Sequence, residues 1–126
     1  MHTDQYLKQA WEVIDSPEKW SIRYRHNVST GQRCALGALD TVYRYRCGTS
    51  EDYDKAVEAL VAVIPDWHDD YHHACTIVAL YNNSHSWEQV RDWWQDAIAY
   101  ARRQRNQSTV DELVKVPATT KVLEPV

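Results

Sequence analysis

Phenylalanine is absent from this chain of 126 residues, and glycine occurs only three times. The scarcity of glycine argues against a β-sandwich, which needs many tight turns, and against a glycine-rich phosphate-binding loop. No apolar run reaches the ~18 residues of a membrane-spanning helix, and residues 1–13 lack the basic and then apolar order of a signal peptide. We therefore expect a cytoplasmic protein that has no membrane partner.

Cysteine is also scarce, and its three positions, Cys34, Cys47 and Cys75, are an odd number without a Cys-x-x-Cys pair. This spacing indicates neither a disulfide framework nor a zinc ribbon. The length fits one domain, because domains typically contain ~100–200 residues and a chain of this size buries a core of its own.

Charge is distributed unevenly along the chain, whose formal net charge is −4. Residues 18–48 carry six basic residues against two acidic ones, whereas residues 49–96 carry ten acidic residues against two basic ones. Such a division can steer a charged partner. It also fits a single domain with oppositely charged, solvated faces, which is the commoner situation.

Apolar residues recur at helical spacing in five stretches, and each stretch predicts a helix. The stretches are residues 4–15, residues 33–47, residues 50–64, a fourth from about Asp66 to Tyr81, and a fifth from Trp87 to about Arg103. Ser50 is placed to cap the third helix, and SWEQ at residues 86–89 matches a capping box before the fifth.

Residues 20–28 have a different period, because Trp20, Ile22, Tyr24 and Val28 alternate with polar residues. Alternation predicts an extended segment with one buried face, and one such segment does not make a sheet. We therefore predict a mainly α, single-domain bundle of about five helices with one extended segment. The helical domain covers residues 1–106, and residues 107–126 form a short helix or a disordered C-terminal tail.

Two motifs resemble a known family. Residues 34–39 read CALGAL, and residues 79–98 read ALYNNSHSWEQVRDWWQDAI. Over roughly residues 5–103 the chain is similar to small proteins of unknown function from actinobacteria and their phages. That family shares a Cys-x-x-Gly-Ala-Leu element and a later turn that usually reads Asn-Asp, where this chain has Asn82-Asn83. The resemblance implies a bacterial or phage protein and carries no activity with it.

The stretch PDWHDDYHHAC (residues 65–75) is a candidate metal site, because His68, His72 and Cys75 share one face of the predicted helix. HDDYH is also similar to the H-E-x-x-H helix of metalloproteases, and His85 is a candidate further ligand. The alternative is a helix start with acids at its positive end and Cys75 in the core. We favour that alternative and expect no cofactor, with zinc as the competing possibility.

Cys34 is a candidate nucleophile, since it lies at the N-terminus of the predicted helix over residues 33–47, whose dipole lowers a thiol pKa, and His72 could serve as its base. A thiol-dependent enzyme would need both groups to converge in one pocket. A small cysteine buried in the core is the commoner outcome, so we expect a protein that is not an enzyme.

A nucleic-acid site is a further alternative, because the basic and aromatic residues Arg23, Tyr24, Arg25 and Arg33 lie close together in the sequence. The acidic character of the chain as a whole counts against it.

The leading expectation is a surface that binds a protein partner or a second copy of the chain. Tryptophan, tyrosine and arginine are enriched at binding hot spots. The candidate anchors are Trp67, at a predicted helix start, and Trp93 and Tyr100, on the flank of the fifth helix. We therefore expect a small helical protein that acts by binding another macromolecule.

Overall fold

The computed structural model describes the backbone of residues 1–65 and 73–123, and the side chains of these ranges up to residue 109. Five helices occur there: α1 (Thr3–Ile14), α2 (Ala35–Tyr45), α3 (Ser50–Ala62), α4 (Ala74–Ser84) and α5 (Trp87–Leu123). The described ranges contain no strand, and their one β-bridge joins Trp20 to Arg33. The prediction of a mainly α bundle of about five helices is confirmed.

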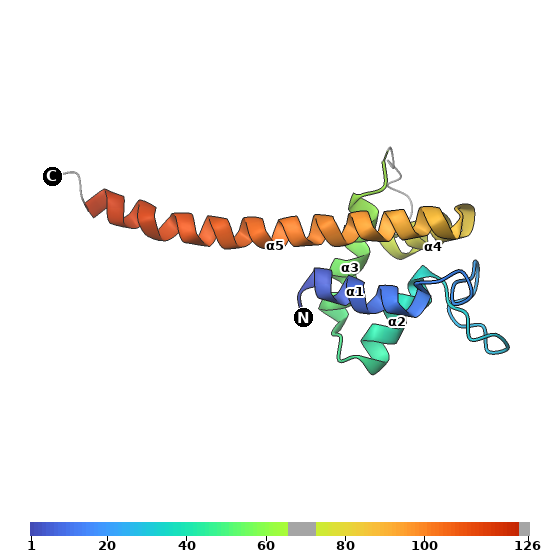
Figure 1. Ribbon diagram of the computed structural model, residues 1–126. Helices are drawn as coiled ribbons and strands as arrows, with labels where there is room; N and C mark the ends of the chain where they lie inside the picture. Colours follow the sequence, from blue (N-terminus) through green and yellow to red (C-terminus); the bar gives the residue numbers. More distant parts are fainter. Residues whose placement is uncertain (66–72, 124–126) are drawn as a thin grey trace.

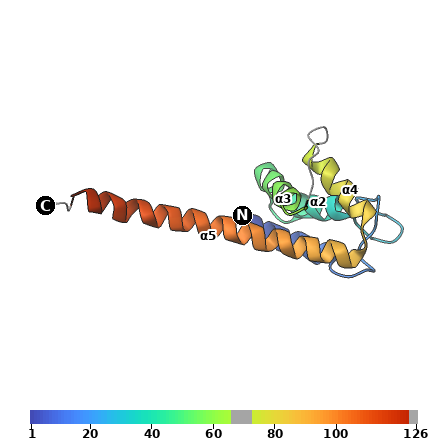
Figure 2. The same ribbon diagram turned by 90° about the horizontal axis from the view of Figure 1, so that it is seen from above.

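Helix α5 is the longest element and lies alongside α1 (Figure 1), while α2, α3 and α4 lie on one side of it (Figure 2). The view from above shows that its C-terminal half extends away from the other four helices (Figure 2). Within the described part of the chain, no helix combines the length and the apolar character needed to cross a membrane.

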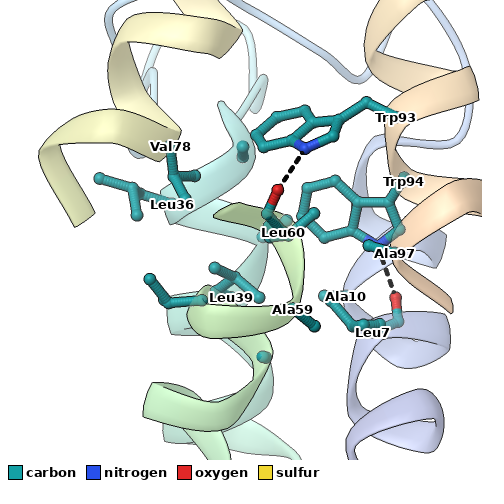
Figure 3. Packing of buried hydrophobic residues seen from close by; sticks show 14 of the residues in the cluster. Leu7, Ala10, Leu36, Leu39, Ala59, Leu60, Val78, Trp93, Trp94 and Ala97 are labelled. Carbon is teal, nitrogen blue, oxygen red and sulfur yellow. Dashed lines mark hydrogen bonds between the residues drawn. The ribbon is translucent and has the colours of Figure 1, made fainter. Parts of the chain in front are cut away.

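Two adjacent tryptophans attach α5 to the rest of the bundle. The indole N–H of Trp94 donates to the carbonyl oxygen of Leu7 in α1 at 2.8 Å, and that of Trp93 donates to the carbonyl oxygen of Leu60 in α3 at 2.8 Å (Figure 3). Successive side chains of a helix point ~100° apart. One pair of neighbours therefore reaches two different helices.

Tyr6 makes the corresponding contact between α1 and α2, because its hydroxyl donates to the Leu39 carbonyl oxygen at 2.8 Å. Burial, together with the negative charge of Asp40, raises the pKa of the Tyr6 hydroxyl. The hydroxyl therefore keeps its proton and remains a donor.

The predicted ends of three helices need correction, while one predicted cap is confirmed. The third helix is capped by Thr49 and not by Ser50, because Thr49 Oγ1 accepts from the Asp52 N–H at 3.1 Å and Asp52 Oδ2 accepts from the Thr49 N–H at 3.0 Å. The predicted capping box of the fifth helix is confirmed, with the Ser86 N–H donating to Gln89 Oε1 at 2.9 Å and the Gln89 N–H donating to Ser86 Oγ at 3.2 Å.

The fourth helix does not start near Asp66. It begins at Ala74, with His73 as an extended N-cap residue, and it ends at Ser84. Residues 66–72 lie outside the described residues.

The predicted end of the fifth helix near Arg103 is also wrong, since α5 continues through residues 107–123. No glycine or proline interrupts residues 87–116, so the backbone has no reason to stop where the apolar pattern ends. The last buried residue is Ala101, so the loss of pattern ends the packing of the described part of α5 and not the helix.

Trp93 was a candidate surface anchor, and its expected exposure is wrong: only 3 % of it is exposed. We therefore expect Trp93→Ala to lower the free energy of unfolding by ~3–5 kcal/mol, since it leaves a large cavity and removes the bond to Leu60. Urea unfolding followed by circular dichroism measures this. The exposed neighbour Gln95 gives the control, and Gln95→Ala should change stability by less than ~0.5 kcal/mol. Equal effects of the two variants would contradict the burial.

A basic and aromatic face on helix α2

The alternating pattern of residues 20–28 predicts that this segment before α2 buries one face. The structure shows that it does not. Ile22, Tyr24 and Val28 are 39, 56 and 87 % exposed, and only Trp20 is half-buried. Arg23 has a φ of 74°, in the left-handed region, which breaks the extended path. Side chains on either side of Arg23 therefore do not alternate across one surface, and the segment is a loop.

Asn82 in the last turn of α4 holds this loop in place. Its Oδ1 accepts from the indole N–H of Trp20 at 2.7 Å and from the backbone N–H of Ala35 at 3.0 Å. Its Nδ2 donates to the Ser21 carbonyl oxygen and to Asn83 Oδ1, each at 3.2 Å. The amide is fully buried. Its nitrogen donates two hydrogen bonds and its oxygen accepts two, so every donor of the amide is used.

Asn83 extends this anchor to the next part of the loop, because its Oδ1 also accepts from the Arg23 N–H at 2.8 Å. Together the two asparagines join the end of α4 to the loop and to the first turn of α2. The turn expected at Asn82-Asn83 is thus the last turn of helix α4.

The Cys-x-x-Gly-Ala-Leu element is the part of α2 against which the loop packs. The Cys34 N–H donates to the Tyr24 carbonyl oxygen at 2.8 Å. A Cβ on Gly37 would overlap the backbone carbonyl of Arg25. Glycine is therefore required at residue 37 because the loop backbone crosses the helix there, and not because of the helix itself.

The loop and the helix enclose a hollow of about 210 Å³ whose polar lining is mainly basic. It is lined by Arg25, His26, Arg33, Gly37, Asp40, Arg44 and Tyr45. Three arginines thus face one aspartate, in a chain whose net charge is −4.

Two of these arginines are held in position. Arg25 Nη1 pairs with Asp40 Oδ2 at 2.7 Å, and Arg33 Nη1 contacts the Thr41 hydroxyl. Burial lowers the pKa of the Arg25 guanidinium, but the hydrogen bond and the charge of Asp40 outweigh that effect, so the pKa is raised.

Other exposed side chains in and beside this hollow are free to contact a ligand. Within the described part of the chain, the guanidinium groups of Arg23 and Arg44 have no hydrogen-bond or ion-pair partner. Tyr24 and Tyr45 are 56 and 71 % exposed. We call these residues, with Arg25, His26 and Arg33, the basic face.

A second hollow of about 190 Å³ adjoins the first and shares Asp40 and Arg44 with it. Its other lining residues are Tyr43, Ser50, Tyr53 and Asp54, from α2 and α3. Helix α2 therefore carries a basic hollow and, beside it, one with aromatic and acidic walls.

The candidate metal site falls largely outside the described residues, which include neither His68 nor His72. Among the residues that are described, no group of three histidine, cysteine, aspartate or glutamate side chains could hold a metal ion. Cys75 is half-buried, beside the hydroxyl of Tyr53. His85 stacks on the Tyr81 ring at 3.6 Å between centroids, and its Nδ1 lies 2.8 Å from the Tyr81 carbonyl oxygen.

Cys34 lies at the N-terminus of a helix, as predicted, where it is the N-cap residue of α2. It is only 5 % exposed, and its thiol makes no capping bond. The predicted base His72 is not among the described residues. Of the candidate partner anchors, Trp67 is also outside them, Trp93 is buried, and Tyr100 is half-buried against the core. Among the described residues, the exposed tyrosines are on α2 and its preceding loop instead.

The comparison with protein families gives one result. The model of a family described as "Family of unknown function (DUF6197)" matches residues 1–112, and the chain therefore belongs to this family. No curated protein and no solved structure matches the chain.

The anchoring by Asn82 gives a prediction for stability. Asn82→Ala leaves the Trp20 indole, the Ala35 N–H and the Ser21 carbonyl without their partner, so we expect a loss of about 1–3 kcal/mol in the free energy of unfolding. Hydrogen exchange at the Ala35 amide should be faster in Asn82→Ala than in the wild-type chain, because the Ala35 N–H loses its acceptor. Asn83→Ala is the matched control, because Asn83 is exposed and only accepts hydrogen bonds. A larger effect at Asn83 than at Asn82 would be incompatible with this anchor.

The contact at Gly37 gives a second prediction. Gly37→Ala forces the Arg25 backbone away from α2, and overpacking of this kind costs ~1–3 kcal/mol. Backbone amide chemical shifts should change mainly at residues 23–27 and in the first turn of α2. Ser50→Ala serves as the control, because Ser50 is exposed at the edge of the second hollow and does not line the hollow that the loop encloses. Unchanged shifts at residues 23–27 in Gly37→Ala would show that the loop does not pack there.

Proposed function

We propose that this member of the family binds an acidic protein partner through the basic face. The observation that carries the proposal is the convergence of three arginines in one hollow of an otherwise acidic chain. Arginine presents a planar fork of donors that matches a carboxylate, and charge-assisted bonds of this kind are stronger than neutral ones.

The charges of this face support a carboxylate as the recognised group. Asp40 neutralises Arg25, but Arg44 lines the same hollow without a partner among the described residues, and Arg23 lies on the adjoining loop without one. A carboxylate of the partner would supply the missing counter-charge. Because residues 49–96 carry ten acidic residues against two basic ones, an acidic partner would be directed toward this face and repelled by that part of the chain.

The rigidity of the face also supports binding. Its loop is fixed by the buried Asn82 amide and by the contact with Gly37. Groups that are ordered before association lose less conformational entropy when they bind. Tyr24 and Tyr45 add exposed aromatic area beside the arginines, a composition typical of binding hot spots.

A protein is favoured over a nucleic acid, although Arg23, Tyr24, Arg25 and Arg33 would also serve the nucleic-acid alternative. The second hollow places Asp40 and Asp54 next to the arginines. A strand of phosphates would be repelled by these carboxylates, whereas a protein surface can present groups of both signs. The resemblance to proteins of actinobacteria and phages extends the proposal to the cytoplasm of a bacterial cell, where the partner would belong to a host process.

A glutamate-rich peptide of about ten residues is a direct probe for the basic face. We expect it to bind the wild-type chain, with an affinity that falls as salt is raised, in isothermal titration calorimetry. Arg23→Gln and Arg44→Gln should each weaken binding about two- to fivefold, the effect of an exposed charge pair. Arg102→Gln is the matched control, since Arg102 is an exposed arginine on α5.

Three outcomes contradict the proposal. One is the absence of binding, and another is equal weakening by all three substitutions. The third is a single-stranded oligonucleotide of equal charge that binds more tightly than the peptide, which would favour the nucleic-acid alternative.

A further inference from the structure

We infer that the second hollow on α2 receives a single cationic side chain, a lysine or an arginine, from the same protein partner. This inference rests on the proposed function, because it concerns the residues next to the basic face. The hollow lies between α2 and α3 and is distinct from the basic one, although both are bordered by Asp40 and Arg44.

The size and the walls of the hollow fit one long side chain. Its volume of about 190 Å³ is below the ~300–1,000 Å³ of sites for drug-sized ligands. The Tyr43 and Tyr53 rings meet edge to face, with their centroids 6.2 Å apart and an interplanar angle of 73°. Tyr43 is 46 % exposed. Aromatic rings offer an apolar wall to the stem of a lysine or arginine and a negative π-face to its charged end.

The charges of the hollow favour a cation. Asp40 uses Oδ2 for Arg25, and within the described part of the chain its other oxygen has no hydrogen bond. Asp54 is exposed and has no ion pair with any described residue. Burial, followed by the charge of Asp40, raises the pKa of the Tyr53 hydroxyl. The phenol is therefore neutral, and because Asp40 is already paired with Arg25, Asp54 is the carboxylate of the lining that has no counter-charge among the described residues.

Arg44 connects the two hollows. It is the one positive group in the lining of the second hollow, and it also lines the basic one. A partner carboxylate bound in the basic hollow would neutralise Arg44. Arg44 would then no longer repel a cation in the second hollow. The arrangement therefore selects a partner segment that carries an acidic residue close to a lysine or arginine.

The test uses two small probes that differ in one charge. Nα-acetyl-lysine amide has a cationic end, and Nα-acetyl-norleucine amide has a neutral side chain with the same carbon stem. In an NMR titration we expect the lysine probe to shift the ring signals of Tyr43 and Tyr53 and the Asp54 amide in a saturable manner. The norleucine probe should leave these signals unchanged or shift them without saturation.

Substitutions assign the effect to the hollow. Asp54→Asn should weaken binding of the lysine probe about threefold, and Tyr43→Leu should weaken it by a similar factor. Asp96→Asn is the control, because Asp96 is an exposed aspartate on α5, outside the hollow. Equal binding of the two probes, or equal effects of Asp54→Asn and Asp96→Asn, would overturn the inference.

The glutamate-rich peptide separates the two proposals. If the lysine probe fails to bind and the peptide still binds through Arg23 and Arg44, only the cation hollow is wrong. If the peptide fails and the lysine probe binds, the acidic-partner proposal is wrong. Binding of the lysine probe would still support the hollow as a cation site.

Discussion

One buried amide, that of Asn82, determines how the candidate binding face is presented. It lies where the end of α4, the start of α2 and the loop between α1 and α2 meet, and it makes hydrogen bonds to all three. A buried amide with every bond satisfied specifies one geometry, whereas an apolar residue of the same size would tolerate several. The arginines of the basic face owe their relative positions to a residue that no ligand would touch.

The absence of phenylalanine is explained by how the core is connected. Tyr6, Trp93 and Trp94 are buried, and each donates one hydrogen bond to a backbone carbonyl of a neighbouring helix. Phenylalanine also has an aromatic ring, but it has no hydrogen-bond donor. In this bundle the large rings therefore fix the relative positions of the helices as well as excluding water from the core.

The sequence predicts the helices well, because their apolar faces and the Ser86 capping box are local features. It does not predict the loop at residues 20–28, since the alternation of Trp20, Ile22 and Tyr24 is overridden by one residue, Arg23, in a left-handed conformation. It also misplaces Trp93, because a helical wheel assumes one buried stripe. Here α5 packs against α1 and α3 at once, which buries a wider arc than one stripe. The basic face itself combines residues from the loop and from α2, and their convergence depends on Asn82 and Gly37, which are distant in sequence.

The role of Asn83 bears on how the family can vary. Its side-chain oxygen accepts two hydrogen bonds, from the Arg23 N–H and from Asn82 Nδ2, and both could be accepted equally by a carboxylate. Aspartate at this position would preserve the path of the loop while adding a negative charge beside Arg23. The backbone geometry and the surface potential of this face are thus separable, and a single substitution could change which partners are attracted without remodelling the fold.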